Sequence, residues 1–266
     1  MSDETPTPEP AALYERRGNI ALITLNRPRA LNAVNGALAT AVGNHLEEAN
    51  NDDEVRVVVI TGAGRAFCAG ADLKALAAGE DTSAEGHPEW GFAGYAQHWS
   101  AKPTIAAVNG FALGGGTELV LASDLAVVDE KAKLGLPEVK RGLFAAAGGV
   151  IRMQQQIPRK VALELALTGE PISAAQGKEL GLVNRVAPAG TALEVALELA
   201  ETIAANAPVA VRESKAMIHR TANSPDWETE AWDANRNALK VVFTSEDAME
   251  GPRAFAEKRQ PVWKGR

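Results

Sequence analysis

The chain has 266 residues, and 27 lysines and arginines against 34 aspartates and glutamates give it a formal net charge of −7. This charge excludes broad electrostatic binding to nucleic acid or to an anionic membrane, because an acidic surface releases no counterions from phosphate groups. With 46% apolar and 23% charged residues, the composition is that of a folded globular protein rather than a disordered chain.

The amino-terminal residues 1–10 are rich in proline and acidic side chains and predict a disordered tail. They lack the basic and apolar regions of a secretory signal. The single cysteine, Cys68, excludes an intramolecular disulfide, and we therefore expect a cytoplasmic protein. The uncharged stretch 103–117 is interrupted by glycines and Asn109 and is too short to span a membrane.

The first ordered elements are predicted from residue 11 onward. Two apolar runs within residues 13–25 flank Arg17-Gly18-Asn19, a pattern typical of a β-hairpin. Asn35 can cap a helix over 36–50, where apolar residues recur at helical spacing. Residues 55–60 are mostly β-branched and apolar, which indicates a strand buried on both faces.

The middle of the chain, 61–149, is dense in glycine and alanine, with buried strands expected at 104–108 and 125–128. A polar, acidic stretch at 79–91 indicates a surface loop or lid. From residue 158 onward the pattern is helical, and Ser173 with Gln176 forms a capping box before a helix that Gly181 ends. The expected helices are 158–168, 173–180, 191–206, 208–219, 228–242 and 245–257.

Several common catalytic patterns are absent. The run from Gly62 to Phe67 has phenylalanine where a dinucleotide fingerprint needs its third glycine. No phosphate loop and no nucleophile elbow occurs. The four histidines, His45, His87, His98 and His219, have spacings unrelated to metal ligation, so we expect no metal site.

The strongest candidate segment is Gly114-Gly115-Gly116-Thr117-Glu118, which opens a short apolar helix. Its glycines allow close backbone approach, and free amides at a helix start favour an oxyanion. Glu118 is equally explained as a structural carboxylate at a helix terminus. Glu138, which follows Pro137, is a second carboxylate in an apolar setting. Two such groups suit a reaction in which one delivers and one removes a proton, although spacing alone leaves open whether they meet.

Taken together, several segments resemble the crotonase family, also called the enoyl-CoA hydratase/isomerase family, over residues 14–266. The segments that carry the resemblance are Asn26 to Ala33, Thr61-Gly62, Ala66 to Lys74, Lys102-Pro103, Ala106 to Gly110, Gly114 to Glu118, and Pro137-Glu138. The resemblance implies an α/β fold: a crotonase-like spiral of β-β-α units at 11–200, followed by an all-helical trimerisation region at 201–266. It also implies a homotrimer or a dimer of trimers.

The resemblance further implies roles for individual residues. The amides of Ala71 and Gly115 would form an oxyanion hole for a thioester carbonyl, and Glu118 and Glu138 would be the acid/base pair, with the individual roles left open. The residues that would contact coenzyme A are Arg29, Ala30, Leu31, Arg65, Ala69, Lys74 and, from a neighbouring subunit, Phe255 and Lys258. No metal and no separate cofactor is implied, since coenzyme A is part of the acyl-CoA substrate.

The implied activity is that of a lyase of fatty-acid β-oxidation that hydrates a 2-trans-enoyl-CoA to a 3-hydroxyacyl-CoA. Alternatives are a carnitinyl-CoA dehydratase, which the C-terminal segment resembles most closely, an enoyl-CoA isomerase, and a non-catalytic acyl-CoA-binding subunit. The chain departs from the usual hydratase pattern at Ala145-Ala146-Ala147, where Ala146 replaces a glycine. The replacement keeps an amide able to hold the water but adds a methyl group and closes positive φ, which disfavours efficient hydration of small enoyl-CoA esters. Trp90, Phe92, Tyr95 and Trp99 either line a pocket for a quaternary ammonium group or serve as simple packing.

Overall fold

The computed structural model describes residues 9–225 and 227–266. The predicted tail at 1–10 lies outside the described residues except for residues 9 and 10. Ten strands form two sheets within the described residues. The larger sheet contains β1 (Ala12–Arg17), β2 (Ile20–Leu25), β3 (Val57–Gly62), β5 (Thr104–Val108), β7 (Leu125–Asp129) and β10 (Arg185–Ala187), in that order. The smaller sheet contains β4 (Ala66–Cys68), β6 (Phe111–Leu113), β8 (Lys133–Gly135) and β9 (Ile172–Ser173).

The helices follow the predicted pattern and add short ones. Their bounds are α1 (Gly36–Asn51), α2 (Leu73–Ala77), α3 (Gly115–Ala122), α4 (Gly149–Gln156), α5 (Arg159–Thr168), α6 (Ala174–Leu180), α7 (Ala192–Ala204), α8 (Pro208–Thr221), α9 (Thr229–Thr244) and α10 (Glu246–Ala256). Short 3-10 helices cover Pro28–Ala30, Pro88–Trp90, Phe92–Gly94 and Pro137–Arg141. No helix in the described part of the chain is long and apolar enough to cross a membrane.

Local sequence signals explain several element boundaries. The predicted hairpin forms between β1 and β2, with Gly18 in the left-handed region at φ +58°. The Asn35 side chain accepts a hydrogen bond from the Leu38 amide and caps α1. The Ser173 capping box is present at α6, and Gly181 ends that helix. The structure confirms these three expectations. They could be predicted from the sequence because each depends on residues close together in the chain.

The chain alternates between the two sheets as it advances. Each of β3, β5 and β7 in the large sheet is followed by β4, β6 and β8, respectively, in the small sheet. Strands β2, β3, β5, β7 and β10 are parallel, whereas β1 is antiparallel to β2. This arrangement confirms the predicted spiral of β-β-α units.

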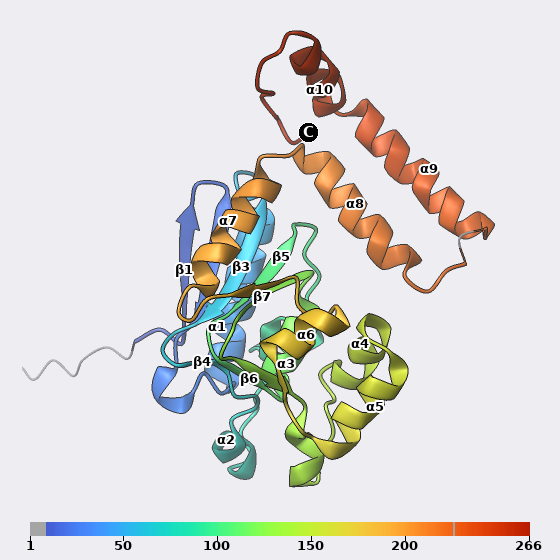
Figure 1. Ribbon diagram of the computed structural model, residues 1–266. Coiled ribbons are helices and arrows are strands. Elements are labelled where there is room, and N and C mark those ends of the chain that lie inside the picture. Colours follow the sequence, from blue (N-terminus) through green and yellow to red (C-terminus); the bar gives the residue numbers. More distant parts are fainter. Residues whose placement is uncertain (1–8, 226) are drawn as a thin grey trace, which may run out of the picture.

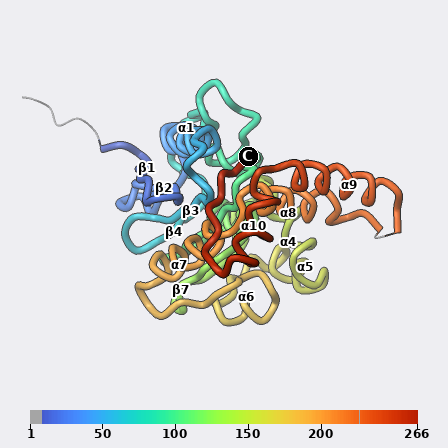
Figure 2. The backbone as a smooth tube through the Cα atoms, turned by 90° about the horizontal axis from the view of Figure 1, so that it is seen from above, coloured from blue at the N-terminus to red at the C-terminus, as the bar shows by residue number. Residues whose placement is uncertain are grey.

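The large sheet is covered on both faces. Val58 and Ile60 of β3 belong to a core that includes α1, whereas Val57 and Val59 face a second core formed with α7. Figure 2 shows α1 and α7 on opposite sides of the strands. Burial on both faces explains why β3 is an apolar run instead of an alternating pattern.

Helix α7 ends the part of the chain that packs on the sheet. Its four buried alanines recur every four residues and let the helix approach the strands closely: Ala192, Ala196, Ala200 and Ala204. The predicted boundary between residues 200 and 201 therefore falls within this helix. After Ala205 the chain leaves the core, and α8, α9 and α10 extend away from it as a C-terminal arm (residues 208–266; Figure 1).

Candidate active site

Glu118 lies in the first turn of α3 and is almost fully buried, with 3% of its surface exposed. Its Oε1 accepts a hydrogen bond of 2.8 Å from the Gly149 amide at the start of α4. Burial raises the pKa of the Glu118 carboxyl to about 7, and the nearby Glu138 adds to this, whereas backbone hydrogen bonds and the charge of Arg152 oppose it. Glu118 can therefore hold or release a proton near neutral pH.

Glu138 lies in the 3-10 helix Pro137–Arg141 and faces the same site. Its Oε1 lies against Gly114, where an added Cβ would be 3.1 Å away, and its buried Oε2 has no hydrogen-bond partner among the described residues. Burial raises the pKa of Glu138 as well. Burial thus favours the protonated form of each carboxyl, and the charge of Glu138 adds to this effect at Glu118. A reaction that uses one acid and one base requires one protonated and one ionised group.

The two predicted oxyanion-hole amides are brought to the same place. Ala71 forms a parallel bridge with Val34 that uses the Gly70 carbonyl (2.9 Å) and the Asp72 amide (2.8 Å), so the Ala71 N–H points away from Val34. Gly115 is the first residue of α3, where an N–H has no acceptor within the helix. A Cβ on Gly70 would lie 3.3 Å from the Gly115 nitrogen, so these two segments are in contact.

Two glycines allow this close packing. Gly114 has φ +57°, a conformation that side chains disfavour. A Cβ on Gly116 would fall 2.1 Å from the Cys68 carbonyl oxygen, so any other residue would push α3 away from β4. The glycine run is therefore required by both conformation and space.

Six of the predicted coenzyme A contacts lie along one edge of the core. The Ala69 amide donates to the Leu31 carbonyl (3.0 Å), which joins the segment that contains Arg29 and Ala30 to the segment that leads to Lys74. A Cβ on Gly64 would lie 3.0 Å from the Pro28 Cβ, which places the turn bearing Arg65 beside the same segment. Their contact with coenzyme A stays a prediction.

Phe255 and Lys258 lie elsewhere in the protomer. Phe255 is in α10 and 87% exposed, and Lys258 follows that helix. Figure 1 shows α10 and α2 at opposite ends of the molecule. One chain thus does not bring these two residues to Glu118, and their contribution from a neighbouring subunit stays a prediction.

The sequence reasoning missed residues that hold the site together. Arg27 pairs with Asp72 (3.0 Å) and so braces the start of α2. The buried Asn32 side chain donates to the carbonyls of Ala63, Ala66 and Phe67. Arg27 and Asn32 both lie within the segment Asn26 to Ala33, which carries part of the resemblance to the crotonase family. That resemblance was the sequence signal that could have identified them.

The Ala145-Ala146-Ala147 run leads into the turn before α4. Ala146 is exposed and does not adopt positive φ, whereas Gly148 does, at +105°. The backbone groups that reach Glu118 are those of Gly149 and Ala147 instead of the Ala146 amide. The role of the Ala146 amide toward a water molecule stays a prediction.

The four aromatic residues do not form one pocket. Only Phe92 reaches the site, and a Cβ on Gly115 would lie 2.3 Å from its ring. Trp90 stacks between His87 and His98, with ring centroids 3.9 and 4.3 Å away. The Tyr95 hydroxyl pairs with Ser123 at 2.9 Å, and Trp99 contacts His219 edge to face. Trp90, Tyr95 and Trp99 therefore serve as packing residues, as one of the two alternatives proposed.

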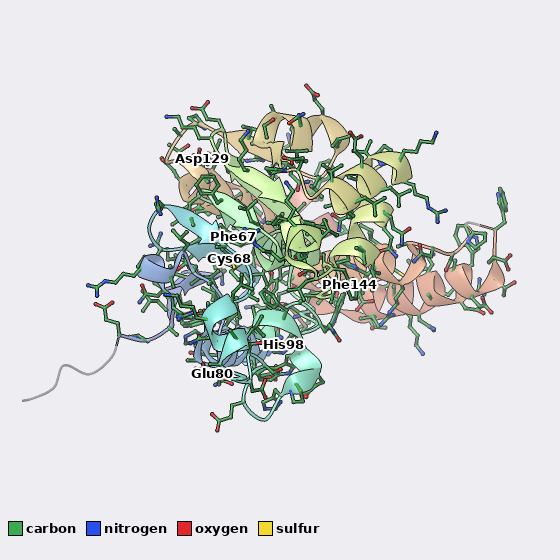
Figure 3. The ribbon with its side chains drawn as sticks, turned by 90° about the horizontal axis from the view of Figure 1, so that it is seen from below. Phe67, Cys68, Glu80, His98, Asp129 and Phe144 are labelled. Atoms are coloured by element: carbon green, nitrogen blue, oxygen red, sulfur yellow. The ribbon has the colours of Figure 1, made fainter. Side chains whose placement is uncertain are left out.

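Cys68 takes no visible part in the chemistry. It lies in β4 and is fully buried, and burial raises the pKa of its thiol to about 12. Figure 3 labels it next to Phe67 among the inner side chains. A thiol held neutral in this way is a poor nucleophile and a poor metal ligand. Within the described ranges 9–225 and 227–266, no three His, Cys, Asp or Glu side chains gather as a metal site.

The chain is similar to known proteins over nearly its whole length. Residues 15–266 match the sequence model of the family described as Enoyl-CoA hydratase/isomerase. The chain is 42% identical over 261 residues to enoyl-CoA hydratase EchA19 of Mycobacterium tuberculosis, covering 97% of each protein. It is 43% identical over 256 residues to carnitinyl-CoA dehydratase of Salmonella heidelberg, covering 94% of this chain and 97% of that protein. The crystal structure of carnitinyl-CoA hydratase from Mycobacterium avium is 59% identical, with a TM-score of 0.78 over 97% of this chain and 100% of that one.

Proposed function

The chain belongs to the enoyl-CoA hydratase/isomerase family, and we propose that it is a lyase that reversibly hydrates a 2-trans-enoyl-CoA to a 3-hydroxyacyl-CoA. The observation that carries this proposal is the meeting of two carboxyls, the buried Glu118 and the half-buried Glu138, beside the first amide of α3. Names of relatives support the reaction class, since they include an enoyl-CoA hydratase and a carnitinyl-CoA dehydratase.

In the proposed mechanism the thioester carbonyl oxygen accepts hydrogen bonds from the amides of Ala71 and Gly115. This polarisation makes the β-carbon electrophilic and stabilises the negative charge that develops on the oxygen. Loss of one such donor in other enzymes costs about 2.7–4 kcal/mol of transition-state stabilisation. The helix dipole of α3 acts in the same direction.

The two glutamates then divide the proton transfers. The ionised carboxylate takes a proton from water while the water oxygen bonds to the β-carbon. The protonated carboxyl delivers its proton to the α-carbon, so the product gains one water and the pair again carries one proton. Each proton transfer of this kind contributes roughly 10²–10⁴ in rate. We propose no cofactor, because coenzyme A enters as part of the substrate.

A second candidate is the hydration of an acyl-CoA whose acyl group carries a quaternary ammonium ion. The 59% identity to a protein named carnitinyl-CoA hydratase favours it. The Phe92 ring beside Gly115 is the one aromatic face of the four that is placed to meet the acyl group. Isomerisation and pure acyl-CoA binding are less well supported, because both glutamates are kept and both have a raised pKa.

The deciding experiment follows the ultraviolet absorbance of the enoyl thioester with crotonyl-CoA and, in parallel, with crotonobetainyl-CoA. Loss of absorbance with crotonyl-CoA supports the hydratase, and a much higher kcat/KM for crotonobetainyl-CoA assigns the second candidate. Tight binding of both thioesters without hydration would leave only the non-catalytic binding protein.

We also propose that the enzyme is a homotrimer or a dimer of trimers and that it acts in the cytoplasm. Two exposed apolar surfaces support assembly: one on the arm, including Phe243 and Met249, and one around α4 and α5, including Phe144, Ile151 and Leu167. Two different surfaces that bind each other between copies generate a closed ring when the rotation allows it. The free, buried thiol of Cys68 supports a reducing compartment.

A further inference from the structure

Arg152 occupies a place that the electrostatics of a helix disfavour. It lies in the first turn of α4, next to the positive end of the helix dipole, and burial lowers the pKa of its guanidinium. No carboxylate lies within ion-pair distance of Arg152 in the part of the chain that the structure describes. A half-buried cation at this position needs another source of stabilisation.

Two backbone carbonyls and one negative charge stabilise the Arg152 guanidinium. Nη1 of Arg152 donates to the Ala147 carbonyl (3.3 Å), and Nη2 donates to the Ala96 carbonyl (2.5 Å). The charge of Glu118 is near enough to interact favourably with the guanidinium. The planar guanidinium of an arginine holds its donors in a fixed geometry that matches both carbonyls, whereas a lysine presents all its donors from one flexible ammonium group.

The position of the guanidinium is fixed by a glycine. A Cβ on Gly148 would lie 2.1 Å from Nη1 of Arg152, and Gly148 itself has φ +105°. The side chain therefore folds back over the turn that presents the Gly149 amide to Glu118. Its second carbonyl partner, Ala96, belongs to the segment that carries Phe92. Arg152 thus joins the two segments that flank the reacting carboxyl.

We propose that Arg152 is a positioning residue that holds the 145–149 turn against the 92–96 segment and stabilises the carboxylate form of Glu118. This inference rests on the proposed hydration reaction for its kinetic consequence. Its electrostatic part concerns the free enzyme and can be tested without substrate.

Two variants separate the role of the planar guanidinium of Arg152 from the role of its positive charge. Arg152→Lys keeps the charge and loses the planar guanidinium, whereas Arg152→Gln keeps a donor and loses the charge. We expect kcat to fall roughly 10–100-fold in both variants while KM changes less than about threefold, because the thioester contacts lie elsewhere. The limb of the kcat/KM profile that reports the Glu118 proton is the alkaline limb if Glu118 is the acid of the pair and the acidic limb if it is the base. This limb should move up by about 0.5–1 pH unit in Arg152→Gln and stay in place in Arg152→Lys.

The matched control is Arg159→Gln, which removes the same charge from an exposed position at the start of α5. An infrared pH titration of the carboxyl bands, taken as the difference between each protein and its Glu118→Gln counterpart, reports the Glu118 proton directly. An Arg152→Gln titration that matches the parent protein, or a shift of equal size in Arg159→Gln, would overturn the proposal. If the parent protein hydrates no enoyl-CoA, the proposed function fails, and the infrared titration still decides the role of Arg152.

Discussion

The β-β-α core and the C-terminal arm bury their apolar side chains in different ways. In the core, the strands and α1 enclose large residues such as Phe67, Leu38 and Ile60 completely. In the arm, Phe243 is 72% exposed and Phe255 is 87% exposed. A cavity of about 690 Å³ separates α8 from the core. The chain's own packing thus sets the geometry of the proposed catalytic pair, Glu118 and Glu138, whereas the arm leaves an apolar surface for another molecule to cover.

The sharpest test of the core side is Glu118→Gln. Glutamine keeps an acceptor for the Gly149 amide but cannot carry the proton, so we expect kcat to fall at least about 10³-fold with thioester binding nearly unchanged. Steady-state kinetics and binding of a saturated acyl-CoA measure this. Unchanged turnover would remove Glu118 from the mechanism.

Glu118→Gln should lower activity but raise the stability of the folded protein at alkaline pH. The pKa of Glu118 is raised in the folded state from 4.5 to about 7, so ionisation above pH 7 costs the native protein up to about 3 kcal/mol. This cost is absent below pH 4.5 and is complete above pH 7. We therefore expect Glu118→Gln to raise Tm at pH 8 and to change it less at pH 5.

Asp124→Asn tests how the arm is held to the core. Asp124 pairs with the nearly buried Lys215 (2.7 Å) and with His219 (2.8 Å), both on α8. Loss of one partner of a buried ion pair leaves an uncompensated charge and typically costs about 3 kcal/mol or more. Limited proteolysis near residues 205–207 and a lower Tm at fixed protein concentration should report a loosened arm.

Lys215→Met is the matched comparison for Asp124→Asn. Asp124 would keep its hydrogen bonds from the Thr104 amide and hydroxyl, so this change should cost less. Equal proteolysis of both variants and of the parent protein would show that the ion pair does not hold the arm.

Phe243→Asp tests whether the exposed face of the arm mediates assembly. A charge in an apolar contact cannot be desolvated cheaply, so we expect the oligomer to dissociate at micromolar concentration. Asn237→Asp introduces the same charge on an exposed position of α9 and should leave the oligomer intact. Light scattering coupled to size exclusion distinguishes the two, and a Phe243→Asp protein of parental size would place the contact elsewhere.

The smallest expected effect is that of Lys258→Gln. If Lys258 reaches a phosphate of coenzyme A in a neighbouring subunit, KM should rise only a few-fold, because an exposed ion pair contributes up to about 1 kcal/mol. Lys240→Gln, on the exposed side of α9, is the control. An unchanged KM would confine the coenzyme A contacts to the core.

The sequence predicted the elements whose signals are local. The β1–β2 hairpin, the α1 cap at Asn35 and the α6 capping box depend on residues a few positions apart, and the spiral fold was predicted from the resemblance of whole segments. The predicted pair Glu118 and Glu138 lies where two such segments meet. The short strands β4, β6, β8, β9 and β10 were not predicted, because two or three residues carry too little periodicity. The helix α4 was not predicted either, since its eight residues give only about two turns of pattern.

Only the tertiary structure decided the environment of the reacting groups. That Gly149 donates to Glu118, that Arg152 spans two segments, and that Phe92 alone of four aromatics reaches Gly115 all depend on contacts between distant parts of the chain. The charge count of −7 described the whole surface. The proton affinity of Glu118 is instead set by burial and by the few dipoles and charges folded around it, because electrostatic interactions strengthen where water is excluded.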